Sequence, residues 1–331
     1  MTTSTAVTWE LDGITMQGTV VRPDGDGPFP AVVLVAGSGP TDRDWCSPLM
    51  PGTNGSARLF AEAFAGAGIA SLRYDKRASG PQAMENVGKL IGQLSMGSHL
   101  DELVAAVGVL AAEEFVGPIV ALGNSEGTLH VLRYATSAQD VPLAGIVLAA
   151  PPGRPVGEVL LSQLAAQAAQ IPDGSALMIS VREATERYTA GQPMELDASL
   201  PEAVRLTLGS FENPANLPLA RELWTESAVD RLPQVEVPAL VLIGGKDVQI
   251  DVRADGDRLQ AAAAGMDNVT FAFPPDANHV FKEDTRALKE IAAAPGTGYN
   301  EDGTRLDPEA LELILGWLSL VFSSSGSSGT D

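Results

Sequence analysis

The segment "PIVALGNSEGTLHVLRYA", residues 118–135, places Ser125 between two glycines at a predicted change from strand to helix. The apolar run that ends at Gly123 is typical of a buried strand, and the residues after Ser125 have helical spacing. Flanking glycines allow the tight turn that exposes a nucleophilic hydroxyl above a sheet, beside the positive end of a helix dipole. Ser125 is therefore a candidate catalytic nucleophile, although a tight turn that merely contains serine would give the same pattern.

A serine nucleophile needs a general base, and the chain contains three histidines. His279 follows the last predicted strand, in "PPDANHVFKED", and loops at the carboxyl ends of parallel strands form ligand sites. We interpret His99 and His130 as structural residues in or beside predicted helices. In one large class of serine hydrolases the chain order is serine, acid, histidine, and only His279 leaves room for an acid after Ser125.

The acid that orients the histidine should also follow a strand. Asp247 comes directly after the apolar run and glycine pair of "ALVLIGGKD", and the interval to His279 fits one helix and one strand. Asp251 and Asp255 are rivals that lie further from the strand end, and we interpret Asp251 as a helix cap. Asp247 would hold the imidazole in its correct tautomer and stabilise the imidazolium.

Acyl transfer also needs donors for the oxyanion. The backbone N–H of Glu126, the residue after the nucleophile, is one candidate. The second candidate is the backbone N–H of Ser38 in "LVAGSGPTDRDW", the loop that follows an early strand. A glycine-rich loop of this kind also fits a simple turn.

Composition limits the classes of function. The 331-residue chain has a net charge of −21, which argues against nucleic acid and anionic membrane surfaces as partners. A single cysteine, Cys46, allows no internal disulfide, and the spacings of zinc sites are absent, so we expect no metal. No signal peptide or membrane-spanning run is recognisable, which favours a cytoplasmic protein. The sequence leaves a homo-oligomer open.

Apolar strand-like runs alternate with helix-like segments along most of the chain. Strands are predicted at 14–23, 31–37, 69–75, 118–124, 143–152, 238–247 and 268–275, and helices at 56–68, 98–115, 125–137, 253–265 and 307–322. This alternation, with strands too apolar for a sheet exposed on one side, predicts an α/β fold with a mostly parallel sheet and helices on both faces.

The alternation stops in the middle of the chain. Residues 153–231 contain helix-like segments separated by proline and glycine, without a buried strand. We therefore predict one core formed by residues 1–152 and 232–322, with 153–231 as a helical cap insertion. The polar stretch 323–331 is expected to be a flexible tail.

Four motifs carry a family resemblance over residues 20–320 outside the insertion. These are "GSGPTDRD" at 37–44, "RYDKRASG" at 73–80, "GNSEG" at 123–127 and "GKDVQID" at 245–251. With them the chain resembles the α/β-hydrolase superfamily, and within it the bacterial serine carboxylesterases related to prolyl-aminopeptidase-like hydrolases. The resemblance implies hydrolysis of small-molecule carboxylic esters through an acyl-enzyme, without a cofactor, beneath a helical cap.

Two positions depart from the family pattern. Ala36 stands where many relatives have histidine before the oxyanion loop, and Asn124 stands where histidine often precedes the nucleophile. We expect neither to touch the three catalytic candidates, although both could alter substrate preference. The charged side chains in "RYDKR", namely Arg73, Asp75, Lys76 and Arg77, are interpreted as structural ion pairs at a strand end.

Several functions remain open at this stage. A peptidase or amidase would need an anionic group for the substrate amine, and Glu158 or Glu212 in the insertion could supply it. A thioesterase, a cofactor-free lyase or perhydrolase, and a non-catalytic binding module fit the same scaffold. The first insertion helix has an apolar face that either packs on the core or lines an acyl pocket; it contains Val159, Leu160, Leu164 and Ala168.

Overall fold

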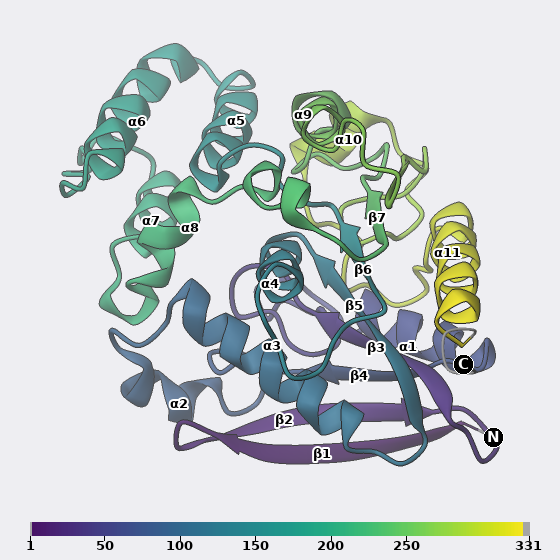
Figure 1. Cartoon of the computed structure of the whole chain (residues 1–331). Helices are drawn as coiled ribbons and strands as arrows, with labels where there is room; N and C mark the ends of the chain where they lie inside the picture. Colours follow the sequence, from purple (N-terminus) through teal and green to yellow (C-terminus); the bar gives the residue numbers. More distant parts are fainter. Residues whose placement is uncertain (1, 327–331) are drawn as a thin grey trace.

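The computed structural model describes residues 2–326, and its central feature is a sheet of eight strands (Figure 1). The strand order is β1-β2-β4-β3-β5-β6-β7-β8. The strands are β1 (Thr3–Leu11), β2 (Ile14–Arg22), β3 (Phe29–Val35), β4 (Ala70–Tyr74), β5 (Val116–Asn124), β6 (Gly145–Ala149), β7 (Ala239–Leu242) and β8 (Val269–Ala272). β2 pairs antiparallel with β1 and β4, and all pairs from β4 to β8 are parallel. The predicted mostly parallel sheet is confirmed.

The apolar runs form the central strands because both faces of the sheet are covered. Every residue of β4, β6 and β7 is buried, as expected of strands packed between two layers of helices. By contrast, β1 at the edge of the sheet is largely exposed. All parallel strands end at the same side of the sheet, so the loops that follow them are brought together there.

Eleven α-helices surround the sheet in the described residues. They are α1 (Ser56–Gly66), α2 (Ala83–Leu90), α3 (Met96–Ala111), α4 (Glu126–Ala135), α5 (Val156–Ala168), α6 (Gly174–Thr189), α7 (Glu202–Ser210), α8 (Leu219–Thr225), α9 (Asp257–Ala262), α10 (Leu288–Ala293) and α11 (Pro308–Gly326). In Figure 1, α3 and α4 lie in front of the sheet and α1 lies behind it. None of the helices within residues 2–326 is both long and apolar enough to cross a membrane.

Helices α5 to α8 form a group of their own at the upper left of Figure 1. They share a second apolar cluster, separate from the core around the sheet, in which the rings of Tyr188, Phe211 and Trp224 meet edge to face. The group is tied to the rest of the molecule through α8, where the Leu219 N–H donates to the Leu94 carbonyl oxygen at 2.8 Å.

Several elements differ from the sequence-based expectation. Strand β1 and the short helices α2 and α10 had no predicted counterpart. The residues expected to begin a flexible tail, 323–326, continue the last helix, and the serine hydroxyls there bond back to carbonyl oxygens one turn earlier. The remainder of that predicted tail, 327–331, lies outside the described residues.

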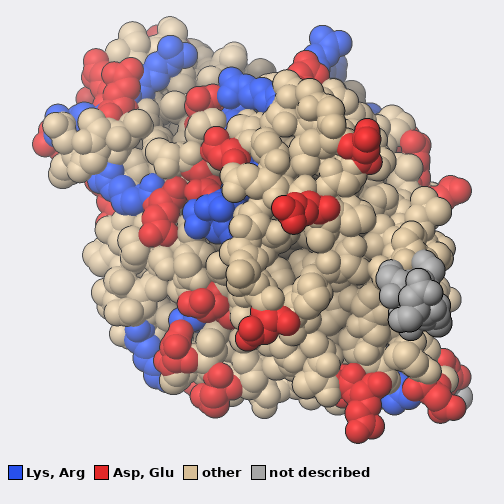
Figure 2. All heavy atoms as spheres, viewed as in Figure 1, with Lys and Arg blue, Asp and Glu red and all other residues tan. Residues whose placement is uncertain are grey.

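The charged side chains are distributed without a continuous basic surface on the face drawn in Figure 2. Acidic and basic residues of the described chain are scattered there among uncharged ones. This distribution is consistent with the acidic net charge of −21.

Candidate active site

Ser125 occupies a strained turn between β5 and α4. Its backbone dihedrals are φ 54° and ψ −121°, and a non-glycine residue in such a conformation costs about 1–3 kcal/mol. The neighbouring glycines have no room for a side chain. A Cβ on Gly123 would lie 2.4 Å from the Gly127 carbonyl oxygen, and one on Gly127 would lie 2.6 Å from that of Val35. The Gly-x-Ser-x-Gly spacing therefore reflects close backbone packing around a half-buried serine.

Asp247 and His279 lie side by side in the loops that follow β7 and β8. The Asp247 Oδ2 atom is 2.8 Å from His279 Nδ1, and both residues are buried. The other carboxylate oxygen, Oδ1, accepts hydrogen bonds from the backbone N–H groups of Gln249 and Ile250, at 2.8 and 3.0 Å. The carboxylate is thus fixed on both oxygens and holds the imidazole by its Nδ1 side, which leaves Nε2 for chemistry.

The two rival aspartates have other partners. Asp251 caps the π-helical turn Val252–Gly256, because its Oδ1 accepts from the N–H groups of Arg253 and Ala254. The interpretation of Asp251 as a cap is confirmed. Asp255 is fully buried and pairs with Arg154 at 2.7 Å.

Two side chains that the sequence reasoning did not assign to the site support His279. The Asn124 amide donates to the His279 carbonyl oxygen at 3.0 Å, so the expectation that Asn124 touches none of the three candidates is wrong. The Tyr299 ring stacks on the imidazole, with centroids 6.3 Å apart and planes inclined by 24°. Gln249 donates to the Tyr299 hydroxyl at 3.1 Å, and burial raises the pKa of that phenol.

The loop after β3 lies directly against the nucleophile. A Cβ on Gly37 would be 3.3 Å from both the Ser125 Cβ and the Asn124 carbonyl oxygen. Within residues 2–326, neither the Ser38 N–H nor the Glu126 N–H donates to another group of the chain. Both predicted oxyanion donors therefore follow strands that end beside Ser125, and both residues line a cavity.

A buried group of charged and imidazole side chains lies between α3 and α4. His130 Nε2 is 3.2 Å from Glu126 Oε1, His99 Nδ1 is 3.1 Å from Glu102, and the two imidazole rings are 5.0 Å apart. Burial acts to raise the pKa of Glu126, but the Lys76 charge and the hydrogen bond with His130 outweigh it and lower that pKa. Burial lowers the pKa of His130, so this imidazole is held neutral.

This group also contains the one cluster of metal-ligating side chains found among the described residues. Ligand atoms of His99, Glu126 and His130 all lie within 4.8 Å of one another. The Lys76 ammonium is only 3.8 Å from the Glu126 carboxylate, however, and would repel a second cation. The cluster is better described as a neutralised charge network than as a metal centre.

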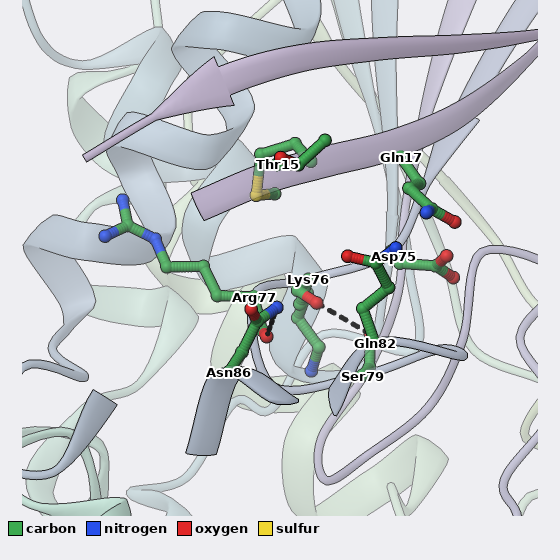
Figure 3. Close-up of a pocket in the computed structure, with 9 residues that line it drawn as sticks. Thr15, Gln17, Asp75, Lys76, Arg77, Ser79, Gln82 and Asn86 are labelled. Atoms are coloured by element: carbon green, nitrogen blue, oxygen red, sulfur yellow. Dashed lines mark hydrogen bonds between the residues drawn. The ribbon is translucent and has the colours of Figure 1, made fainter. Parts of the chain in front are cut away.

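The charged residues of "RYDKR" form ion pairs, as expected. Arg73 pairs with Asp44 at 2.5 Å, Asp75 pairs with Arg43 at 2.5 Å, and Arg77 pairs with Glu102 at 3.0 Å. Figure 3 shows the side chains of Asp75, Lys76 and Arg77 leaving the backbone in three different directions. Lys76 differs from the others because it also contacts a backbone carbonyl of the loop after β3.

A cavity of about 550 Å³ opens beside Ser38 and Glu126. Most of its lining is apolar, and it includes Leu49, Val87, Leu90, Leu94, Val156, Phe211, Leu219, Ala220 and Leu223. Of the two interpretations of the apolar face of α5, packing rather than pocket lining has support, because α5 contributes Val156 to the cavity but neither Leu160 nor Leu164. Both side chains pack in the apolar cluster of α5 to α8, and the cavity is bounded instead by α8 and the segment after α7.

The order of strands, the turn at Ser125 and the Asp247–His279 pair after later strands define the fold as an α/β-hydrolase. A family model for serine aminopeptidases of family S33 matches residues 52–285, and the chain belongs to this family. The resemblance drawn from the four sequence motifs is thereby confirmed.

Individual relatives are more distant. The chain is 28% identical to the esterase EstD of Thermotoga maritima over 266 residues, which is 80% of this chain and 58% of EstD. Proline iminopeptidase from Mycobacterium smegmatis has a similar structure, with TM-score 0.57, 16% identity and coverage of 97% and 100% of the two chains. The Pyrococcus furiosus esterase Pf2001 superposes with TM-score 0.54, 17% identity and coverage of 97% and 91%. At these identities the two structures support the fold alone.

Proposed function

We propose that the protein is a serine esterase that hydrolyses carboxylic esters with short to medium uncharged acyl chains. The observation that carries the proposal is the hydrogen bond of 2.8 Å between Asp247 and His279, in loops at the strand ends where Ser125 emerges from its strained turn. A binding module would need no such oriented imidazole near a serine held in a strained turn.

In the proposed reaction the Ser125 Oγ attacks the ester carbonyl while His279 Nε2 accepts its proton. The Ser38 and Glu126 N–H groups then stabilise the oxyanion, an effect typically worth about 3 kcal/mol for each donor. His279 returns the proton to the departing alcohol and leaves an acyl-enzyme on Ser125. Water attacks this ester with the same base, and collapse of the second tetrahedral intermediate releases the acid and regenerates the serine.

The lining of the cavity favours an apolar acyl group. Its side chains are mostly leucine, valine, alanine and phenylalanine, and the residues of the two proposed oxyanion donors are part of its lining. A volume of about 550 Å³ is in the usual range for small-molecule sites. The relative EstD is named as an esterase, which agrees with this choice of substrate.

A peptidase would need an anionic anchor for the substrate amine. The two glutamates of the insertion that were considered for this role do not line the cavity. Glu158 pairs with Arg258 at 3.3 Å, and Glu212 accepts the Met194 N–H at 2.9 Å. Ester hydrolysis therefore has better support than aminopeptidase activity, although the family is named for the latter.

The test is a comparison of kcat/KM over a series of p-nitrophenyl esters from acetate to dodecanoate with aminoacyl p-nitroanilides. We expect hydrolysis of the esters, with at most about 1 kcal/mol gained per added methylene until the pocket is full and a decline beyond that length. Efficient cleavage of the anilides, without cleavage of any ester, would overturn the esterase proposal in favour of a peptidase.

A further inference from the structure

Lys76 is a buried lysine whose contacts join both sides of the proposed oxyanion hole. It follows β4 and is only 5% exposed. Its ammonium donates to the Gly37 carbonyl oxygen at 2.5 Å and lies 3.8 Å from Glu126 Oε1. Removing an ammonium from water costs several kcal/mol unless it is paired, so these two contacts account for its burial.

The contact of Lys76 with the Gly37 carbonyl oxygen fixes the orientation of the whole Gly37–Ser38 peptide unit. The Gly37 carbonyl and the Ser38 N–H belong to the same peptide unit, which is planar and trans, so they point in opposite directions. Holding the carbonyl oxygen on one side therefore directs the N–H to the other. Glycine places few restraints on the neighbouring torsion, and without the ammonium this peptide would rotate more easily.

We propose that Lys76 is a positioning residue of the oxyanion hole, whose ammonium holds the Gly37–Ser38 peptide with its N–H directed at the substrate carbonyl. The inference rests on the proposed function, because it concerns the same two donors. A cation on the carbonyl oxygen also polarises the amide, which makes the Ser38 N–H a stronger donor in a site of low dielectric.

Glu126 completes the arrangement on the other side. Its backbone N–H is the second proposed donor, and its carboxylate balances the Lys76 charge while accepting from His130. One ammonium therefore connects the loop after β3 to the first residue of α4. The lowered pKa of Glu126, caused by Lys76 and His130 against the effect of burial, keeps this countercharge ionised.

The backbone around Lys76 is itself held rigidly. Asp75 is bound by the Arg43 backbone N–H at 2.7 Å and by its guanidinium. The Ser79 N–H and hydroxyl both bond to the Lys76 carbonyl oxygen, the latter drawn in Figure 3. Gly80 has φ +69°, and a Cβ there would lie 2.4 Å from the Asp75 carboxyl carbon. The backbone of Lys76 is thus held in one position, from which the side chain reaches the Gly37 carbonyl oxygen.

The test compares Lys76→Met, which keeps the length of the side chain but removes the charge, with wild type and with Lys76→Arg. Rates are expressed per active site, counted by the end point of fluorophosphonate titration. We expect Lys76→Met to lower kcat/KM for p-nitrophenyl butyrate about 10²-fold, the usual effect of losing one oxyanion donor. Lys76→Arg should recover part of the loss.

A second readout separates positioning from general destabilisation. A trifluoromethyl ketone forms a tetrahedral oxyanion adduct with the serine, and we expect Lys76→Met to weaken it by the same factor as kcat/KM. The matched control is Lys282→Met, which also removes a buried ammonium bonded to a backbone carbonyl, that of Asn54. It should lower the melting temperature and leave the rate per titrated site and the ketone affinity within about threefold.

The outcomes distinguish this inference from the proposed function. If wild type hydrolyses no ester, the proposed function fails first. If wild type is active and Lys76→Met keeps its rate and ketone affinity within about threefold, the positioning role alone is wrong. A loss confined to KM for esters with a carboxylate would make Lys76 a substrate anchor and also overturn the inference.

If Lys76→Met does not fold, Glu126→Gln replaces it as the test, because it removes the partner of the ammonium but keeps the backbone donor. We expect Glu126→Gln to lower both kcat/KM and the affinity for the ketone about tenfold.

Discussion

Asp247 and Asp251 are four residues apart in one loop, but their carboxylates have different tasks. The Asp247 carboxylate bonds to His279, and the Asp251 carboxylate accepts from backbone N–H groups of the turn that it caps. We predict that Asp247→Asn lowers kcat by about 10⁴-fold, because an amide favours the wrong imidazole tautomer. Asp251→Asn should change kcat less than about threefold, since asparagine also caps helices well. Equal losses in the two purified, folded variants would contradict the choice of acid.

The buried imidazole of His130 predicts a dependence of stability on pH. Burial lowers the pKa of His130, so the unfolded chain binds a proton near pH 6.5 that the folded protein does not. The free energy of unfolding should therefore decrease as the pH falls from 7 to 5. The lowered pKa of Glu126 makes stability depend on pH only below about pH 4.3, where the stability that its ionised carboxylate contributes is progressively lost. That range lies outside the window from pH 7 to pH 5.

His130→Gln keeps a donor for Glu126 but cannot titrate. We predict that its unfolding free energy, measured with urea at pH 5 and pH 7, changes less with pH than that of wild type. If the unfolding free energy of His130→Gln changes with pH as much as that of wild type, the pH dependence comes from groups other than His130.

The three proposed catalytic residues were predictable from sequence because each follows a recognisable strand or turn. The supporting residues were not. The contact of Asn124 with the His279 backbone and the stacking of Tyr299 on the imidazole join segments far apart in the chain. Sequence spacing carries no information about such pairs until the fold brings them together. The sequence predicted that Lys76 lies among charged residues at the end of a strand. Its contact with the Gly37 carbonyl oxygen could not be predicted from the residues adjacent in sequence.

At the scale of elements, α5 and α8 share one cluster but face different surroundings. Leu223 on α8 lines the cavity, whereas Leu164 on α5 packs only among the helices of the insertion. We predict that Leu223→Ala shifts the preferred p-nitrophenyl ester to an acyl chain longer by about one to three carbons, because each buried methylene is worth about 0.8 kcal/mol.

Leu164→Ala is the matched control, since it removes the same atoms from a site away from the cavity. It should lower the free energy of unfolding by about 2–5 kcal/mol and leave the preferred chain length unchanged. The measurement is kcat/KM over the p-nitrophenyl ester series for both variants, which gives the preferred acyl chain length of each. A shift in Leu164→Ala but not in Leu223→Ala would mean that the acyl group binds elsewhere.

The elements that sequence reasoning missed are those with weak patterns. Strand β1 is largely exposed, so it lacks the apolar run that identified the buried strands. Helices α2 and α10 have 8 and 6 residues, too few for a helical period to stand out. The face of α5 was recognised as apolar, but periodicity cannot tell whether such a face meets a neighbouring helix or a pocket.

In the molecule as a whole, Asn54 joins the loop before α1 to the segment that leads into α11. The Asn54 amide donates to the carbonyl oxygens of Glu301 and Thr304, at 3.1 and 2.8 Å. We predict that Asn54→Ala lowers the free energy of unfolding by about 1–3 kcal/mol, because two partly buried hydrogen bonds, each typically worth about 0.5–1.5 kcal/mol, are lost. Thr53→Ala, at an exposed neighbouring position, should change it by less than about 0.5 kcal/mol. Equal effects in urea unfolding would show that this contact does not contribute.

The overall topology was the most predictable feature of the molecule. Alternating apolar strands and helices constrain the chain to a parallel sheet with covered faces, and the break in that pattern marks the helices of α5 to α8. Where those helices lie was less predictable, because their position depends on contacts between segments far apart in the chain, such as the hydrogen bonds of α8 with Leu94 and Met96.

In the proposed mechanism Ser125 is activated by His279 and Asp247 and forms a covalent acyl-enzyme. The most direct measurement is mass spectrometry of the intact protein and its peptides after reaction with a fluorophosphonate, for wild type and Ser125→Ala. We predict a single adduct located on Ser125, no adduct in the folded Ser125→Ala protein, and a loss of ester turnover of about 10⁴-fold or more in that variant. An adduct on another residue, or turnover and labelling that persist in Ser125→Ala, would contradict this mechanism.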